Sequence, residues 1–421
     1  MATEKLYWAD PAARTFEAES ARLSRWQDRA SVVLPRTLFY PEAGGQLGDH
    51  GTLTIGARPI AIDDAQIDDD GVIHHLVAER GEAALAESDL GPTRGAIDDA
   101  RRRDFTAQHT AQHAFSRALL DEANAPTVSS RLGATLCTID VDRVDIPERE
   151  LARAEDLVNA IVTDDVVVRA LFPTDEELAA MDLRRAPKVT ANVRIIDIGG
   201  FDLSPCGGTH CTRSGQIGIV RIAGVERYKG KTRVSFHAGK RALVDARAKE
   251  AALASLAAEL TCGMLDVGNA VAKLRGELKT RTDALAAMRG ELVDRITEAA
   301  WREHPVRLRF ASPATTFVTL VRPHDDVAML RAIANRLTER QDVVALVASL
   351  DPATSDALLV VQRGAGVTGA AAFDCGAWLK STASAHEGRG GGRPERAEGR
   401  IRLTAPTGIG SLDKIASLLP Q

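Results

Sequence analysis

The sequence predicts an α+β protein built from four consecutive domains. Short apolar runs between turn residues fill the first part of the chain, and helical and strand-like patterns alternate in the middle. A long heptad-like stretch then precedes a second mixed segment. We therefore expect a small β-barrel-like domain over 1–90 and an α+β core over 91–240. A helical hairpin over 241–305 and a small α/β domain over 306–421 complete the prediction.

Composition narrows the class of protein. Aromatic residues are only 4% of the 421 residues, so the core must consist mainly of Ala, Val, Leu and Ile. The net charge of −5 argues against indiscriminate coating of nucleic acid but leaves room for a local basic patch. The five cysteines are scattered and odd in number, which favours a reducing, cytoplasmic location. We expect no signal peptide and no membrane span.

Residues 1–90 contain three short strand-like runs, at 31–34, 51–55 and 71–77. A glycine-dense loop at 41–51 lies between the first two; a plain turn is its simplest interpretation, and close approach to another surface is the alternative. His74 and His75 would point to opposite faces of a strand, so we interpret both as structural.

Two short motifs in the core have the residue types and spacing of metal ligands. In QHTAQH (108–113), His109 and His113 are four apart, which places them on one face of a helix. In SPCGGTH (204–210), Cys206 and His210 have the same spacing on what we expect to be a tight glycine turn. Three imidazoles and one thiolate form a tetrahedral set that suits Zn²⁺. Either pair alone would be weak, and buried structural residues are the alternative.

Neighbouring residues extend this prediction. Asp202 precedes the second motif and could accept a hydrogen bond from a ligand's N–H. Cys211 follows His210 directly, and we interpret it as a buried thiol. Four protein ligands leave a tetrahedral ion no open position, so catalysis would need a fifth position or the release of a ligand.

Two basic clusters flank these motifs. Arg101, Arg102 and Arg103 lie about two helical turns before His109, where they could contact phosphate or simply solvate the start of the helix. The segment 218–236 predicts a hairpin. Its tip carries four basic residues that could bind a phosphate backbone or simply face solvent: Arg227, Lys229, Lys231 and Arg233.

The C-terminal half predicts helices and a small α/β domain. Apolar residues at 271–292 have heptad-like spacing, which suggests an arm or a dimer contact; packing on a neighbouring domain is the alternative. Strand, helix, strand and strand follow at 317–321, 327–340, 343–348 and 357–361. Two helices at 370–383 and 411–419 flank a glycine loop with Arg389 and Arg393, which could bind phosphate although it lacks a Walker ending.

Four motifs in order, FYPEAGGQ with DHG, QHTAQH, SPCGGTH and ERYKGKTRV, resemble the editing portion of alanyl-tRNA synthetase. They are still more similar to the free-standing long-form alanyl-tRNA editing proteins of the AlaX family. GGGRP (390–394) resembles the DHH-associated tRNA-binding domain of the same proteins, although Glu395 and Arg396 depart from its usual continuation.

This resemblance implies hydrolysis of Ser-tRNA(Ala), and in some members Gly-tRNA(Ala). It also implies zinc held by His109, His113, Cys206 and His210. Thr135 and Ser130 match the segment that selects the serine hydroxyl, and the loop that holds the ligands suggests further substrate contacts at Gly207, Gly208 and Thr209.

We expect no ATP use and no aminoacylation, since no synthetase activation domain precedes these motifs in the sequence. A homodimer could form through the helical hairpin or the C-terminal domain. The rival hypotheses are a tRNA-binding module with a purely structural zinc, an editing hydrolase of another specificity such as the threonyl type, and a small-molecule or peptide hydrolase.

Overall fold

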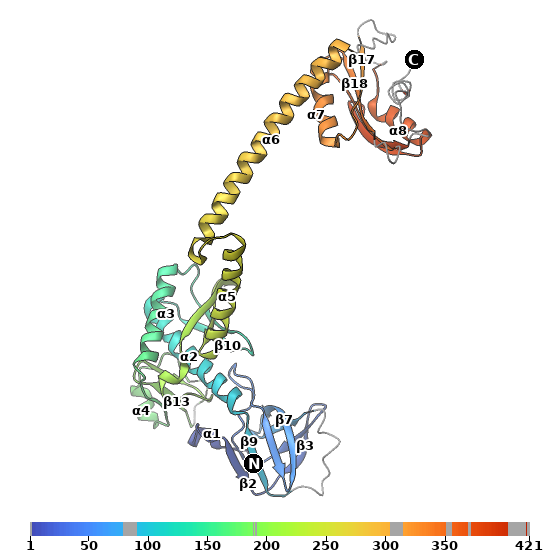
Figure 1. The fold of residues 1–421 in the computed structure, drawn as a ribbon. Helices are drawn as coiled ribbons and strands as arrows, with labels where there is room; N and C mark the ends of the chain where they lie inside the picture. The colour runs from blue at the N-terminus through green and yellow to red at the C-terminus, as the bar shows by residue number, and fades with distance from the viewer. Residues whose placement is uncertain are drawn as a thin grey trace. The chain divides into compact units, whose positions relative to one another are not determined.

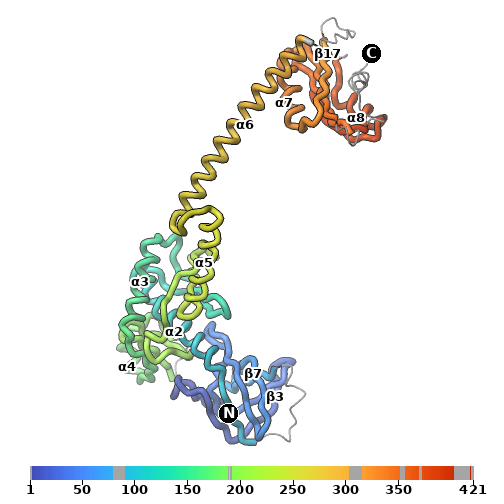
Figure 2. The backbone as a smooth tube through the Cα atoms, in the orientation of Figure 1, coloured from blue at the N-terminus to red at the C-terminus, as the bar shows by residue number. Residues whose placement is uncertain are grey.

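The computed structural model describes residues 2–78, 91–187, 189, 192–303, 315–350, 356–368, 372–402 and 418 (Figures 1 and 2). The chain divides into two compact units, Met1–Leu256 and Ala257–Gln421, and each is described by itself. The fold is α+β, as predicted. The finer division into four domains stays a prediction.

The first part of unit 1 is an antiparallel sheet with strand order β2-β9-β6-β7-β8-β4-β3. Its core includes Phe39, Leu53 and Ile73. In the pairings of the described residues β2 and β3 are edges, so closure into a barrel is not confirmed. The elements are β1 (Glu4–Lys5), α1 (Leu6–Ala9), β2 (Thr15–Ala18), β3 (Arg22–Trp26), β4 (Arg29–Val33), β5 (Arg36–Thr37), β6 (Gly51–Ile55), β7 (Arg58–Ile67), β8 (Ile73–Val77) and β9 (Thr93–Ile97).

The two adjacent histidines of β8 are structural, as predicted. The His74 ring contacts Ser31 at 3.0 Å and Asp68 at 3.3 Å. His75 is fully buried, and its ring nitrogens lie 2.8 Å from the Thr37 hydroxyl and 2.8 Å from the backbone oxygen of residue 32. Both rings therefore have internal partners.

The second part of unit 1 mixes helices with two small sheets, ordered β10-β11-β16-β15 and β12-β13-β14. The long helix α2 packs against α3 (Figure 1). Phe115 of α2 meets Phe236 of β16 edge-on at 5.8 Å. The elements are α2 (Asp99–Ala123), β10 (Thr127–Leu132), β11 (Cys137–Val141), α3 (Glu148–Thr163), β12 (Val168–Leu171), α4 (Asp175–Ala180), β13 (Ile195–Ile198), β14 (Asp202–Pro205), η3 (Ser214–Ile217), β15 (Val220–Tyr228), β16 (Lys231–Ala238) and α5 (Lys240–Glu259).

Unit 2 includes the end of α5 and then a long helix that carries the heptad-like residues. A short turn, η4 (Met264–Asp266), precedes α6 (Val267–Glu303). Leu278, Leu285 and Met288 on α6 are 67%, 64% and 68% exposed, so they contribute no core to this chain. The antiparallel pairing of the two helices stays a prediction.

Within the described ranges, no helix alone has the length and apolar composition of a membrane span. The bent pair Lys240–Glu259 and Met264–Arg302 meets these two criteria only when taken together.

The remainder of unit 2 is a five-stranded sheet, ordered β17-β18-β19-β21-β20. The predicted order of strand, helix, strand and strand is confirmed, and β18 is buried along its whole length. The predicted helix at 411–419 falls outside the described residues, apart from residue 418. The elements are β17 (Thr316–Val321), α7 (Val327–Thr338), β18 (Val343–Leu350), β19 (Asp356–Arg363), α8 (Cys375–Ala385), β20 (Arg389–Arg393) and β21 (Arg396–Arg402).

The glycine segment at 388–396 is not the loop that we predicted. Arg389–Arg393 forms the edge strand β20, which pairs antiparallel with β21. Glycine suits this strand because the backbones lie close together: a Cβ atom on Gly390 would stand 2.9 Å from Gly399 Cα and 3.1 Å from the Leu379 side chain. Tight packing below α8 thus outweighs the low strand propensity of glycine.

Candidate metal centre

Helix α2 carries the first pair of predicted ligands. The Asp98 side chain caps its start by accepting a hydrogen bond from the Arg101 backbone N–H at 3.0 Å. Asn124 ends it in the left-handed conformation, with φ at 44°. Both His109 and His113 are buried on the inner face of this helix. The two histidines therefore lie on one face of the helix, as their spacing of four residues predicted.

The second pair lies on an irregular segment that follows β14, with a bend at Gly208. The Arg194 guanidinium holds this segment, since its Nη1 donates to the Cys206 carbonyl at 2.8 Å and to the Gly208 carbonyl at 2.9 Å. Within 206–210 the chain has only the bend at Gly208, and no described backbone hydrogen bond closes a turn there, so the expected tight turn is absent. Gly208 is needed for another reason: a Cβ there would stand 2.1 Å from His109 Cε1.

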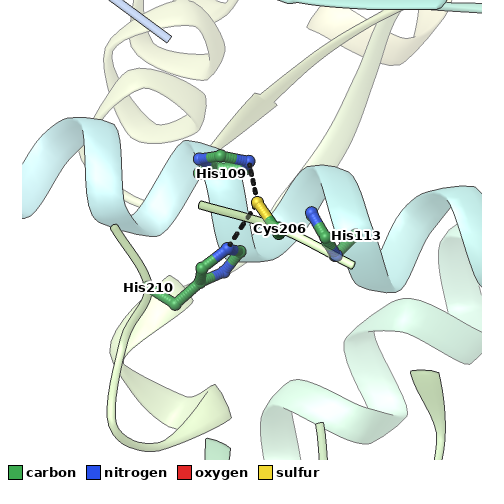
Figure 3. Close-up of side chains that lie close together, drawn as sticks. All are labelled: His109, His113, Cys206 and His210. Carbon is green, nitrogen blue, oxygen red and sulfur yellow. Dashed lines mark hydrogen bonds between the residues drawn. The ribbon is translucent and has the colours of Figure 1, made fainter. Parts of the chain in front are cut away.

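The two pairs converge. One donor atom from each of His109, His113, Cys206 and His210 lies within 4.8 Å of the others (Figure 3). The Cys206 Sγ is 3.4 Å from Nε2 of both His109 and His210. Zinc bonds of about 2.0 Å to nitrogen and 2.3 Å to sulfur would place two tetrahedral ligands about 3.5 Å apart. The cluster therefore has the dimensions of a site for one divalent ion.

A hydrogen bond to the other ring nitrogen orients each histidine. The Nδ1 atoms of His109 and His113 lie 2.7 Å from Gln46 Oε1 and 3.3 Å from Asp202 Oδ2. Nδ1 of His210 lies 3.3 Å from the Thr110 hydroxyl oxygen. The Thr110 hydroxyl donates its own proton to a backbone carbonyl of α2 at 2.8 Å, so it can only accept from His210. Each Nδ1 then carries the proton and each Nε2 keeps a free lone pair, as metal ligands require.

The charges within the cluster support each other. Burial by itself raises the pKa of the Cys206 thiol, but the three neighbouring imidazoles outweigh burial and bring this pKa well below its usual value. Burial lowers the pKa of His109 and His210, which keeps these two rings neutral. Burial also acts to lower the pKa of His113, but the charge of Cys206 and the hydrogen bond to Asp202 outweigh it and raise this pKa, so a metal at His113 would displace a proton. Burial raises the pKa of Asp202, but hydrogen bonds and charge from His113 and Arg184 bring it down to about 2. A thiolate and neutral imidazoles are the metal-binding forms.

One atom tests whether a metal fits. Nε2 of His113 is buried and has no hydrogen-bond partner among the described residues. A buried polar atom without a partner is costly unless a ligand satisfies it. A cation at the centre of the four donors would do so. The residues present therefore fit a tetrahedral divalent metal.

Asp202 was predicted to accept a hydrogen bond from one of the metal-binding residues. The structure confirms this role, because Asp202 Oδ2 accepts from Nδ1 of His113. Cys211 was predicted to be a buried thiol outside the ligand set. It is indeed buried, absent from the cluster, and burial raises its pKa to about 11.

Gln46 is the contact that sequence reasoning missed. It belongs to the glycine-dense loop, which the sequence suggested was most simply a turn. Its side chain is fully buried; Nε2 donates to the Thr209 hydroxyl at 2.9 Å while Oε1 faces His109. Gly45 allows this approach, because a Cβ there would stand 2.8 Å from the Ser130 carbonyl. The glycine density of the loop was the available signal.

The proposed substrate-contacting residues are only partly brought together. Gly207, Gly208 and Thr209 lie between the ligands, and Thr209 is buried against Gln46. Ser130 is half-buried on β10, and Thr135 is exposed in the loop that follows. No described contact joins either hydroxyl to the metal donors.

The three arginines at the start of α2 differ. Arg102 is buried and pairs with Asp49, which corrects its prediction as a phosphate contact, because the guanidinium is already enclosed and neutralised. Arg101 donates to the Gly48 carbonyl at 3.0 Å and is half-buried. Arg103 is exposed, and in the part of the chain that the structure describes it forms only a surface pair with Asp99.

The predicted basic hairpin is present as β15 and β16. Three of its four basic side chains have carboxylate partners: Arg227 with Asp145, Lys231 with Asp142, and Arg233 with Asp140. Lys229 at the turn instead lies over the Tyr228 ring, 5.1 Å from its centroid. In unit 2, Arg389 and Arg393 are exposed on β20 with no ion pair in the described ranges.

Two family models match this chain, and both describe parts of tRNA synthetases. The "threonyl and alanyl tRNA synthetase second additional domain" matches residues 193–235, which include Cys206 and His210. "tRNA synthetases class II (A)" matches residues 12–89. By its matched segments the chain thus falls in the class of proteins that share domains with these enzymes.

More particularly, the chain is similar to alanyl-tRNA editing protein AlaX-L of Pyrococcus horikoshii, with 32% identity over 57% of this chain and 59% of that protein. It is 31% identical to the alanine–tRNA ligase of Halorubrum lacusprofundi, over 69% of this chain and 31% of the ligase. It is 28% identical to that of Synechococcus elongatus, over 96% of this chain and 46% of the ligase. The predicted resemblance is confirmed.

The chain spans 31% to 59% of the length of these relatives. Among solved structures, the chain matches the C-Ala domain of Aquifex aeolicus alanyl-tRNA synthetase. The match covers 25% of this chain and 91% of that domain. Its sequence identity is 19% and its TM-score is 0.21.

Proposed function

We propose that this chain is a trans-editing hydrolase that removes serine, and also glycine, wrongly attached to tRNA(Ala). A zinc ion held by His109, His113, Cys206 and His210 would form its active centre. The observation that carries the proposal is the convergence of these four donors from two remote segments. The similarity to AlaX-L, an alanyl-tRNA editing protein by name, supports the substrate class.

The physical task fits such a centre. A synthetase pocket discriminates poorly between amino acids that differ by one small group, so a second hydrolytic site is needed to reach high accuracy. A bound zinc ion would supply Lewis-acid chemistry and make water a better nucleophile near neutral pH. With four protein ligands, this requires a fifth coordination position or the release of one ligand. Gln46, Asp202 and Thr110 hold the Nδ1 protons of the three histidines, and Arg194 holds the segment that carries Cys206.

Selection of the serine hydroxyl is assigned to Ser130, with Thr135 as the second choice. The Ser130 carbonyl lies against Gly45, next to Gln46, so β10 approaches the residues that orient His109. Thr135 is farther along the same segment and exposed. Ser130→Ala should therefore reduce discrimination between Ser-tRNA(Ala) and Ala-tRNA(Ala) more than Thr135→Ala does.

For tRNA contacts we favour the basic side chains without a buried or close carboxylate partner. Lys229 at the hairpin turn and Arg389 and Arg393 on β20 meet this condition among the described residues. Arg103, Arg227, Lys231 and Arg233 would have to exchange a carboxylate partner for phosphate. Arg101 has no ion pair in the described contacts, but it is half-buried and donates to the Gly48 carbonyl. Salt dependence of RNA binding in variants would rank these contributions.

The decisive experiment measures metal content together with the deacylation of a panel of charged tRNAs. We expect one zinc per chain and fastest hydrolysis of Ser-tRNA(Ala), compared with Gly-tRNA(Ala), Ala-tRNA(Ala) and Ser-tRNA(Thr). Fastest hydrolysis of Ser-tRNA(Thr) would favour the threonyl alternative, which the description of the matching domain keeps open. A protein that binds tRNA and zinc but hydrolyses none of the four would favour a structural metal.

The chain provides a matched pair of cysteine variants for this experiment. Cys206→Ala should lose zinc and activity, whereas Cys211→Ala should keep both, since Cys211 is buried outside the donor cluster. Equal activity of the two variants would contradict the proposal. Circular dichroism would verify that each variant is folded.

Further parts of the proposal concern context. All five cysteines are free thiols, which suits a reducing cytoplasm. The exposed apolar residues of α6 suit a homodimer contact, which light scattering would test. We expect no ATP use and no aminoacylation, which an ATP–pyrophosphate exchange assay would test.

A further inference from the structure

An aromatic pair lies beside the candidate metal centre and is not used by the function proposed above. Trp8 of α1 and Phe172, which directly follows β12, have ring centroids 6.1 Å apart and planes inclined by 52°. Phe172 is 56% exposed, and Trp8 is half-buried. Large aromatic side chains usually bury most of their surface. This pair is an exception and offers an accessible apolar face.

The structure ties this pair to the metal-binding segment. The Trp8 indole N–H donates to the Gly207 carbonyl at 3.0 Å, one residue after Cys206. The indole Cζ2 would be in ordinary contact, at 3.8 Å, with a Cβ on Gly207. A molecule stacked on the aromatic pair would therefore lie next to a group bound at the metal site.

The same place has an excess of positive charge. Lys5 Nζ lies 4.8 Å and the Arg194 guanidinium 5.8 Å from the Trp8 ring centroid. Arg185 is exposed and donates to the Pro205 carbonyl at 3.1 Å. Within the described ranges none of these three cations pairs with a carboxylate, whereas three of the four basic side chains of the β15–β16 hairpin do. Arg194 is buried, so the exposed Arg185 and the half-buried Lys5 are the cations that an anionic partner can reach here.

We infer that Trp8 and Phe172 form a platform on which the terminal adenine of the single-stranded tRNA acceptor end stacks. Exposed aromatic rings combined with unpaired cations are the usual way to hold single-stranded RNA. The ester to be hydrolysed and this adenine share one ribose, so a base site has to adjoin the reacting centre. The inference rests on the proposed function and names the nucleotide subsite of the same centre.

The test uses the full chain with zinc and an uncharged acceptor-stem RNA hairpin that ends in single-stranded CCA. 2-Aminopurine replaces the terminal adenine, because stacking on an aromatic ring quenches its fluorescence. We expect quenching by the wild type, and about tenfold weaker binding with loss of quenching for Trp8→Leu and Phe172→Leu. Trp8→Phe, which keeps a ring, should retain part of the signal.

Two controls separate stacking from a structural effect. Trp26→Leu removes a tryptophan from the edge strand β3 and should leave the quenching unchanged. Zinc content should also stay unchanged in Phe172→Leu, because this exposed side chain touches none of the four donors in the described contacts.

Wild-type affinity and quenching in both leucine variants would overturn the inference, while hydrolysis of mischarged tRNA by the same preparations would leave the proposed function intact. Conversely, quenching that depends on Trp8 in a protein that hydrolyses no mischarged tRNA would support the platform and reject the proposed hydrolysis.

Discussion

Gly208 and His109 lie so close together that a Cβ atom on residue 208 would stand 2.1 Å from His109 Cε1 and 2.5 Å from its Nδ1. The ring cannot move away without leaving the Gln46 oxygen, 2.7 Å from the same Nδ1. The absence of a side chain at position 208 is thus a condition for the geometry of the cluster.

Gly208→Ala is therefore expected to displace the His109 ring and lower deacylation about 100-fold, the scale of a misplacement by about 1 Å. Zinc content and initial rates on Ser-tRNA(Ala) measure the effect. Gly207→Ala is the matched control for zinc content, which should stay near wild type, because among the described atoms its Cβ would meet only Trp8, at 3.8 Å. Similar losses in both variants would mean that general disorder of the segment, and not the contact with His109, is responsible.

Asp202→Asn should weaken zinc binding by about 10- to 100-fold, as is typical when the hydrogen-bond partner of a ligand is changed. The carboxylate accepts from His113 Nδ1 at 3.3 Å and from Arg184 Nε at 2.6 Å, and an amide offers only one acceptor oxygen. Competition with a chromophoric chelator gives the affinity. Asp197→Asn on the neighbouring strand β13 is the control, since among the described contacts that carboxylate accepts only from the Gly200 backbone N–H. Unchanged affinity in Asp202→Asn would show that this hydrogen bond does not orient the histidine.

Asp49→Asn is expected to lower the free energy of unfolding by about 3–5 kcal/mol, because it leaves the buried Arg102 guanidinium without a counter-charge. Arg102 is 1% exposed, and its Nε lies 3.2 Å and 3.1 Å from the two Asp49 oxygens. Arg103→Ala, which breaks an exposed pair next to it, should cost less than about 1 kcal/mol. Urea denaturation of both variants tests this ranking, and equal costs would contradict the assignment of Arg102 to the interior.

His75 should make stability depend on pH. Burial lowers its pKa from 6.5 to about 4 in the folded protein. Between these values the unfolded chain binds the proton and the folded chain does not, so stability is full above pH 6.5 and falls as the pH is lowered toward 4. The loss attributable to this residue is about 3 kcal/mol. His75→Gln should flatten the dependence measured by denaturation between these pH values, and an unchanged slope would assign it to other groups.

Local periodicity was enough to predict much of this protein. The spacing of His109 and His113, and the strand patterns of β6 and β18, depend only on neighbours in sequence, and the structure has them as predicted. The residue types of the two motifs also named the four donors that converge. These features follow from local geometry and from the chemistry of nitrogen and sulfur donors.

Contacts between distant segments could not be read in this way. Gln46 meets His109 across 63 positions, Arg102 meets Asp49 across 53, and Trp8 meets Gly207 across 199. No local pattern distinguishes Arg102 from its exposed neighbour Arg103, or the strand β20 from a glycine loop. The sequence alone determined which side chains could bind a metal. Only the tertiary structure decided which polar groups orient them and which charges are buried, because long-range packing sets desolvation and hydrogen-bond geometry.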